Sequence, residues 1–549
     1  MIIQKLRPYL SLLCKIFLIG LLVQFFLQTF ITFQLGRNGA FWSAVRMRKE
    51  FILFLFIIAI ILALIPKLPE YINIVKKNGG EHSKEGKRLT RNGLRTCFKR
   101  YSIPQFLTIF LITTIVFFLI AILIQKMGLS TFILSFKYDL LPFLIFGLGA
   151  CLAFLFFTEK DKDIFEIYKK LIIISLRWGV CRRVLIYLMP NGLKFFGFDP
   201  FTFEGTIGAR PPAAYYTLIK PFFPGSHVRN GFLFERPISF GFWLIAFFPL
   251  FALTYLRKKT IKKQIGYGFL FWLLVLSTRS RAAIAVIGLE FIALTLIIHR
   301  KQLKKYLRII LTLGLIGGAG VFYYGQKIFA REHSNTGHVV LLVEGRKLAQ
   351  TNLLRGWGAG YSGPASHQLC YTASETIDIF TQLNQISHPD PRCETIRKVN
   401  ITHQISTYGY NPENQYLQII MEYGLLGLLF RLTTLCRILY YSIKTIQKYR
   451  KTEKSSYQQF LYWSILGFGI GLLGLCIEGM LLHSLVDRMV VYPFFLLYGL
   501  TIGLREKVKD VPFIPVLKEK KKKGKVAKKK TSKKKKKKQT PSKKRRKHA

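Results

Sequence analysis

The sequence predicts an all-α polytopic membrane protein with about 12 transmembrane helices and a large extracytoplasmic loop domain between helices 9 and 10. Three observations carry this prediction. First, 51% of the 549 residues are hydrophobic and the mean hydropathy is +0.28. Second, the apolar residues gather in runs of about twenty, the length of helix that crosses a bilayer. Third, the basic residues concentrate in the connectors between these runs.

The apolar runs define the spans, and the basic connectors define their orientation. Short cytoplasmic loops of membrane proteins are enriched in Lys and Arg. With twelve spans, the most basic connectors and both termini fall on one side, which we therefore expect to be cytoplasmic. The expected spans are residues 10–33, 50–66, 105–125, 132–157, 168–190, 238–256, 264–278, 282–299, 307–325, 416–443, 458–479 and 484–504.

These spans divide the chain into six segments, two of which are long loops that face outward. The second of these loops is nearly 90 residues long and rich in aromatic side chains, so we expect a folded cap rather than a linker. The segments are helices 1–5 (1–190), the first extracytoplasmic loop (191–237), helices 6–9 (238–325), the large extracytoplasmic loop (326–415), helices 10–12 (416–505) and a disordered lysine-rich cytoplasmic tail (506–549).

The net charge of +55 indicates partners that carry phosphate groups. Residues 518–549 hold 20 Lys and Arg against one Glu, and the rest of the chain is also strongly basic. A tail of this composition has too few apolar residues to form a hydrophobic core, so we expect it to be disordered. It favours either binding to the anionic inner leaflet of the membrane or a solvated extension without a partner, and nucleic acid is the least favoured partner.

The eight cysteines form no CxxC pair and no Cys/His cluster with metal-ligand spacing, so the sequence predicts no metal site and no cofactor. Cys370 and Cys393 share the large outward loop, in a compartment where disulfides persist. If they pair, they close a loop of about 24 residues, worth roughly 3 kcal/mol. Two free thiols are the alternative.

A polar cluster at residues 412–418 lies where the large loop re-enters the membrane. Glu413, Asn414 and Tyr416 place a carboxylate, an amide and a phenol at this boundary, where such groups are costly unless they are used. The segment is therefore a candidate site. The alternative for Glu413 is a helix N-terminal residue that the helix dipole favours.

Two groups of arginines also face outward. Arg229 and Arg236 end the first outward loop, and Arg279 and Arg281 lie in the tight turn between the seventh and eighth spans. A guanidinium group binds phosphate in a bidentate manner and stays charged. These arginines are therefore candidates for holding a pyrophosphate at headgroup depth, and the alternative is that they reach toward lipid headgroups.

The order and spacing of these motifs resemble the O-antigen ligase/polymerase family. The resemblance covers about residues 190–505, and the chain departs from the family pattern at Glu413, where well-studied ligases carry a His. The matching residues are Arg229, Gly231, Pro237 and Gly241, the Ser280-Arg281 turn, Gly356–Gly360 followed by Ser362–Ser366, and Glu413-Asn414 followed, after nine intervening residues, by Gly424 and Gly427.

The resemblance implies a membrane glycosyltransferase of a bacterial cytoplasmic (inner) membrane with an extracytoplasmic active site. It would move a glycan from an undecaprenyl-pyrophosphate carrier to a sugar hydroxyl on a glycolipid or glycan acceptor, with inversion and without a metal. Arg229 and Arg281 would hold the pyrophosphate, and Glu413 would orient or deprotonate the acceptor. The other substrate-binding candidates are Arg236, Arg279, Asn414, Tyr416 and His403.

Several alternatives stay open. An imidazole from His403, His388, His367 or His338 would replace the missing histidine, and no spacing distinguishes among them. A surface polysaccharide polymerase or a protein O-oligosaccharyltransferase would share the same motifs. From other classes, a lipid or glycan transporter or flippase has a similar number of spans, and a catalytically inactive membrane scaffold would use the basic tail.

Overall fold

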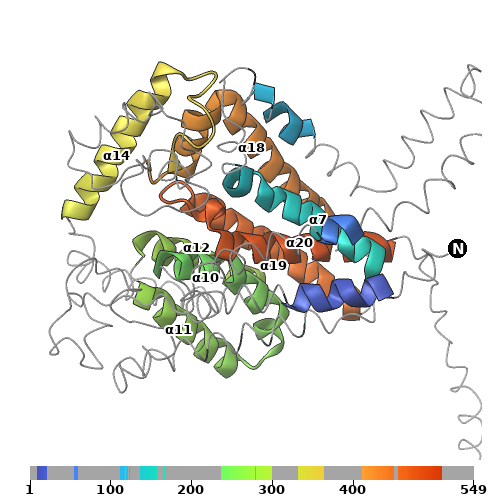
Figure 1. Cartoon of the computed structure of the whole chain (residues 1–549). Coiled ribbons are helices and arrows are strands. Elements are labelled where there is room, and N and C mark those ends of the chain that lie inside the picture. The colour runs from blue at the N-terminus through green and yellow to red at the C-terminus, as the bar shows by residue number, and fades with distance from the viewer. Residues whose placement is uncertain are drawn as a thin grey trace, which may run out of the picture. The chain divides into compact units, whose positions relative to one another are not determined.

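The computed structural model describes eight stretches of the chain and a few single positions between them. The stretches are residues 9–20, 55–59, 112–117, 136–157, 237–298 apart from position 279, 332–363, 411–449 and 456–509. Every regular element in these stretches is a helix, as Figure 1 shows. The all-α class is therefore confirmed for the described residues.

Four of the described helices are long and apolar enough to cross a membrane, and two more are apolar but shorter. This composition supports the predicted membrane protein. The total of twelve spans, the sidedness and the segment boundaries stay predictions. The four long segments are Ile238–Lys258, Arg281–Ile298, Gln415–Gln447 and Tyr457–Glu478, and the shorter ones are Tyr9–Gly20 and Leu141–Phe156.

Helix α10 (Pro237–Thr254) is almost completely buried and lies against α19 (Ser456–Glu478) and α12 (Arg281–Ile298). Its apolar residues surround the whole helix, which is the pattern of a helix buried on all sides. Small residues of α19 let the two backbones approach closely, because a Cβ at Gly471 would overlap the Ala246 carbonyl. The 3-10 turn η5 (Leu256–Lys258) then leads into α11 (Ile261–Thr278).

A second contact joins α7 (Leu141–Phe156) to α20 (Arg488–Lys509). Gly149 and Gly499 face the backbone of the opposite helix, again with no room for a Cβ. At the start of α7, the Tyr492 hydroxyl donates to the Lys137 carbonyl (2.8 Å). These contacts fix the segment before α7, which carries Asp139, against the last helix.

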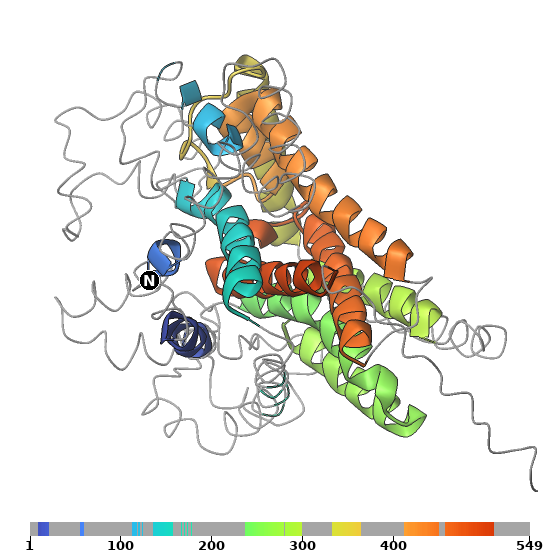
Figure 2. The same ribbon diagram turned by 90° about the vertical axis from the view of Figure 1, so that its right-hand side faces the viewer.

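Helix α18 (Gln415–Tyr449) crosses the group of helices diagonally, and α14 (Glu332–Thr351) lies beside its beginning, as both ribbon views show (Figures 1 and 2). The turn η7 (Ser484–Val486) connects α19 to α20. The amino end of α18, the carboxyl end of α19 and α14 therefore come together.

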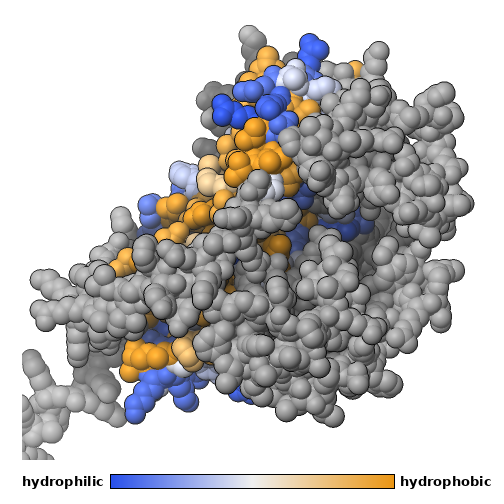
Figure 3. Space-filling model, turned by 90° about the vertical axis from the view of Figure 1, so that its left-hand side faces the viewer, coloured by the Kyte–Doolittle hydropathy of each residue, from blue (hydrophilic) through white to orange (hydrophobic). Residues whose placement is uncertain are grey.

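One exposed stripe of α18 is apolar. Leu425, Leu429 and Leu432 are 40%, 64% and 40% exposed and recur at helical spacing, so they form one outward stripe. In Figure 3 the described apolar residues form a band with hydrophilic residues beyond both of its ends. Such a band is what lipid tails cover in a membrane-spanning helix.

The chain divides into two compact units, residues 1–508 and residues 509–549. The contacts among the helices described above join residues of the first unit. Apart from Lys509, the last residue of α20, the lysine-rich tail lies outside the described residues.

Candidate functional site

The amino end of α18 is held in place by hydrogen bonds to the carboxyl end of α19. Asn414 caps α18, because its Oδ1 accepts from the Leu417 N–H (2.9 Å). The Gln415 N–H donates to the Gly479 carbonyl (2.9 Å), and Gln415 Oε1 accepts from the Leu485 N–H (2.9 Å). The beginning of α18 is therefore a rigid part of the molecule, and it presents Glu413 one residue before the cap.

Glu413 is the one non-glycine residue with a positive φ among the described residues, with φ of 52°. Its N–H donates to Asn411 Oδ1 (3.2 Å), which stabilises this turn. Left-handed backbone is costly for a side chain of this size. Such conformations persist where surrounding structure imposes them, and they cluster at functional sites.

His338, in the middle of α14, contacts the Glu413 carboxylate through its Nδ1. The two side chains are 39% and 31% exposed, so the pair is half-buried and accessible from outside. Burial lowers the pKa of the His338 imidazole below its ordinary value, and the positive charge of Arg281 lowers this pKa further. The structure thus gathers His338, Glu413 and Arg281 from three separate segments of the chain.

Arg281 is the first residue of α12, after a tight turn from α11. Ser280 caps α12, with its Oγ accepting from the Ala283 N–H (3.4 Å), and Thr278 Oγ1 accepts from the Ser280 N–H (3.1 Å). A positive charge at a helix amino end opposes the helix dipole. Helix stability therefore does not explain Arg281, whereas an anion near the site would.

A glycine-rich segment, residues 353–363, docks against a break in α18. Gly424 interrupts the helix with φ of 69° and ψ of −170°. The Trp357 and Gly358 N–H groups donate to the Met421 (2.7 Å) and Glu422 (3.0 Å) carbonyls, and the Leu425 N–H donates to the Leu353 carbonyl (2.9 Å). The segment therefore supplies partners for backbone groups that the break releases.

The Glu422 side chain forms hydrogen bonds with the backbone of this segment. Its Oε1 accepts from the N–H groups of Gly360 (3.1 Å) and Ser362 (3.3 Å). The Glu422 carboxyl group also lies close to that of Asp139. Glu422 thus connects residues 353–363 to α18.

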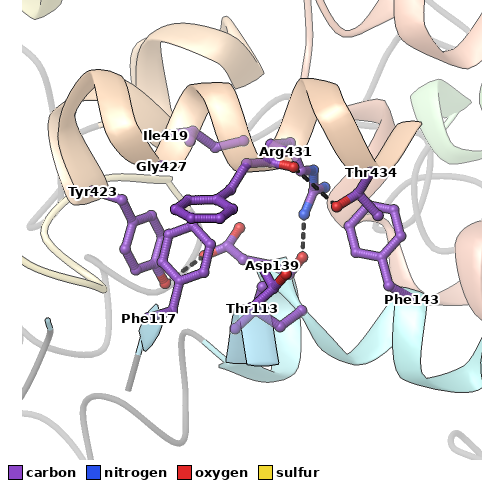
Figure 4. Close-up of a pocket in the computed structure, with 11 residues that line it drawn as sticks. Thr113, Phe117, Asp139, Phe143, Ile419, Tyr423, Gly427, Arg431 and Thr434 are labelled. Atoms are coloured by element: carbon purple, nitrogen blue, oxygen red, sulfur yellow. Dashed lines mark hydrogen bonds between the residues drawn. The ribbon is translucent and has the colours of Figure 1, made fainter. Parts of the chain in front are cut away.

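Figure 4 shows the cavity on the other side of Asp139, lined by residues of α18, α7 and the segment around Phe117. The Tyr423 hydroxyl donates to Asp139 Oδ2 (3.2 Å), and Arg431 Nη1 donates to the Asp139 carbonyl. Arg431 also lies over the Phe143 ring, 4.6 Å from its centroid. The cavity leaves about 20 Å³ for the centres of water molecules, which is room for roughly one water.

The structure brings together some of the residues that the sequence indicated. Glu413 and Arg281 share the site with His338, which was one of four candidate histidines. Asn414 and Tyr416 border it, but the Asn414 Nδ2 donates to the Met480 carbonyl (2.7 Å), just after α19, and the Tyr416 hydroxyl donates to the Cys476 carbonyl (2.8 Å), within α19. Outside the described residues lie Arg229, Arg236, Arg279, His403, Cys370 and Cys393.

Sequence reasoning did not indicate Asp139 or Arg431. The available signal was a charged residue within an apolar run, which marks a functional position in a membrane protein. Gly424 was indicated only as part of a motif, and the structure shows that it breaks the helix. Among the described residues, no group of three or more His, Cys, Asp or Glu side chains is arranged to hold a metal ion.

The chain was compared with protein-family models, with curated proteins and with solved structures. None of the three comparisons gave a match. The assignment of function therefore depends on the chemistry of the site and on the resemblance of its motifs.

Proposed function

We propose that this chain is an O-antigen ligase-like glycosyltransferase. It moves a glycan from an undecaprenyl-pyrophosphate carrier to a sugar hydroxyl on a glycolipid or glycan acceptor, at the outer face of a bacterial cytoplasmic membrane. The observation that carries the proposal is the convergence of Arg281 with the His338–Glu413 pair. The reaction needs a fixed cation for the leaving group and an acid–base pair for the acceptor.

In this proposal, Arg281 binds the pyrophosphate of the glycan donor. When the glycosyl bond breaks, negative charge develops on the pyrophosphate, and a guanidinium already in place stabilises this charge. Arg281 is the first residue of α12 and lies near enough to His338 for its charge to act on the imidazole, and in the proposed reaction it holds the lipid pyrophosphate at the membrane interface. The acceptor hydroxyl then approaches from the side of His338 and Glu413.

The proposal is tested by incubating purified protein with a lipid-pyrophosphate glycan and candidate acceptors, without a nucleotide sugar. Arg281→Ala should abolish transfer while membrane insertion is unchanged, because the variant loses the cation that stabilises the leaving group. The matched control is Arg346→Ala, which removes the same charge from an exposed position of α14. Full activity of Arg281→Ala would contradict the assignment.

The size distribution of the product separates the members of the family. A single added glycan indicates a ligase, a ladder of lengths indicates a polymerase, and transfer to a protein acceptor indicates a protein O-oligosaccharyltransferase.

One observation favours a second candidate, a lipid or glycan transporter or flippase. The break of α18 at Gly424 lies next to the buried acidic side chains of Glu422 and Asp139, and broken helices with buried charges line the binding sites of many transporters. Translocation of a labelled lipid-linked glycan in proteoliposomes, without glycosidic product, would support this function instead.

A further inference from the structure

The contact between His338 and Glu413 assigns different roles to the two side chains. An ionised carboxylate accepts hydrogen bonds and has no hydrogen to donate. Because Nδ1 of His338 faces the carboxylate, Nδ1 carries the hydrogen of the neutral ring and Nε2 carries the lone pair. The imidazole is therefore fixed in the tautomer in which Nε2 can accept a proton.

We propose that His338 is the general base of the transfer reaction and that Glu413 is a positioning residue that holds its imidazole. This inference rests on the proposed glycosyltransferase function. The imidazole of His338 belongs to α14, whereas the carboxylate of Glu413 lies just before α18. The pair thus combines two segments that are separated by 75 positions in the sequence.

The local structure supports this division of roles. The backbone of Glu413 is held by the Asn411 side chain in a left-handed conformation, and its carboxylate is directed to His338. Among the described residues, the charged groups that face His338 are Glu413, before α18, and Arg281, at the start of α12. Burial and then Arg281 lower the pKa of His338, which favours the neutral ring that a general base requires.

In the proposed step, the oxygen of the acceptor hydroxyl attacks the anomeric carbon of the donor sugar. The new C–O bond forms as the bond from this carbon to the pyrophosphate oxygen breaks, with its electron pair leaving on the lipid pyrophosphate. The hydroxyl proton moves to Nε2 of His338, and Glu413 stabilises the imidazolium that results. Arg281 balances the charge on the leaving group.

The experiment measures the pH–rate profile of the purified, full-length protein and of four variants with a lipid-pyrophosphate glycan and acceptor. His338→Ala should reduce kcat by ~10²- to 10⁴-fold and remove the acid limb of the profile. Glu413→Gln should reduce kcat less and move the acid limb to lower pH, because the imidazolium loses its anionic neighbour. Glu413→Asp should restore part of the rate, and the exposed neighbour variant Val339→Ala (59% exposed) should match the wild type.

Other outcomes overturn the inference. If Glu413→Gln abolishes transfer while His338→Ala retains most of it, Glu413 is the base and His338 supports it. A full rate with an unchanged acid limb in His338→Ala removes His338 from the mechanism. Should His338→Ala fail to fold, His338→Gln, checked for a monodisperse detergent-solubilised form, takes its place.

The same measurements separate this inference from the proposed function. Wild-type protein that transfers no glycan to any acceptor contradicts the function itself. Wild-type protein that transfers glycan and loses this activity in Arg281→Ala, but not in His338→Ala, contradicts the assignment of the base alone.

Discussion

At the scale of single residues, Glu413 combines an unfavourable backbone with a useful position. Its positive φ suits Asn or Gly better than Glu, and the other left-handed residues in the described part of the chain are glycines. The Glu413 side chain contacts His338. The presence of a glutamate at this position is therefore better explained by a role of its carboxylate than by a contribution to the stability of the fold.

Glu413→Asn tests this explanation through stability. Asn adopts left-handed backbone at little cost, which gains up to ~1 kcal/mol, whereas the half-exposed contact with His338 contributes only ~0–1 kcal/mol. We therefore expect the melting temperature in detergent to stay the same or rise while the transfer rate falls. A melting temperature clearly below that of the wild type would show that the carboxylate is needed for the fold.

At the scale of elements, the break in α18 and the glycine-rich segment depend on each other. A Cβ at Gly424 would overlap the Leu354 carbonyl, and a Cβ at Gly356 would overlap the Glu422 carbonyl. Two backbones can approach this closely only where both lack side chains. The hydrogen bonds of Glu422 to Gly360 and Ser362 then complete the junction between the loop and the membrane helix.

Gly424→Ala should disrupt this junction. The substitution strains a left-handed backbone and overlaps a carbonyl, so we expect the protein to lose at least ~2 kcal/mol of stability. Hydrogen exchange should speed up in residues 353–363. The control is Gly266→Ala, in an open position of α11, where Ala should be neutral or stabilising by ~1 kcal/mol. Equal behaviour of the two variants would show that the break does not hold the segment.

At the scale of the whole molecule, the described helices place the site at one end of a membrane-crossing group. Arg281, His338 and Glu413 lie at the amino ends of α12 and α18 and on α14. The basic turn around Lys258, Lys259 and Lys262 lies at the opposite end of α10 and α11. The distribution of Lys and Arg predicts that this turn is cytoplasmic and the site extracytoplasmic.

Cysteine substitution checks this orientation in intact cells. Val339→Cys, on α14, should react with a membrane-impermeant maleimide above the background of the native chain, whereas Lys262→Cys should react only after permeabilisation. Both positions are exposed in the structure, so access depends on the side of the membrane rather than on burial. Reaction of Lys262→Cys alone in intact cells would reverse the predicted topology.

The sequence by itself determined the helical class and the positions of several helices, and it indicated two of the residues that the structure brings together at the candidate site. Apolar runs and basic connectors depend only on local composition, so α11 and α12 coincide closely with the expected spans 264–278 and 282–299. Polar residues at a membrane boundary likewise marked Glu413 and Arg281.

Only the tertiary structure showed that His338 joins them and what Gly424 does. The contact of His338 with Glu413 depends on α14 lying beside the start of α18, and no sequence spacing encodes such a contact between distant segments; the other three candidate histidines lie outside the described residues. The proximity of Glu422 to Asp139 and the role of Gly424 arise in the same way, because each requires a partner far away in the chain. Local patterns specify helices and their ends, and packing specifies which side chains meet.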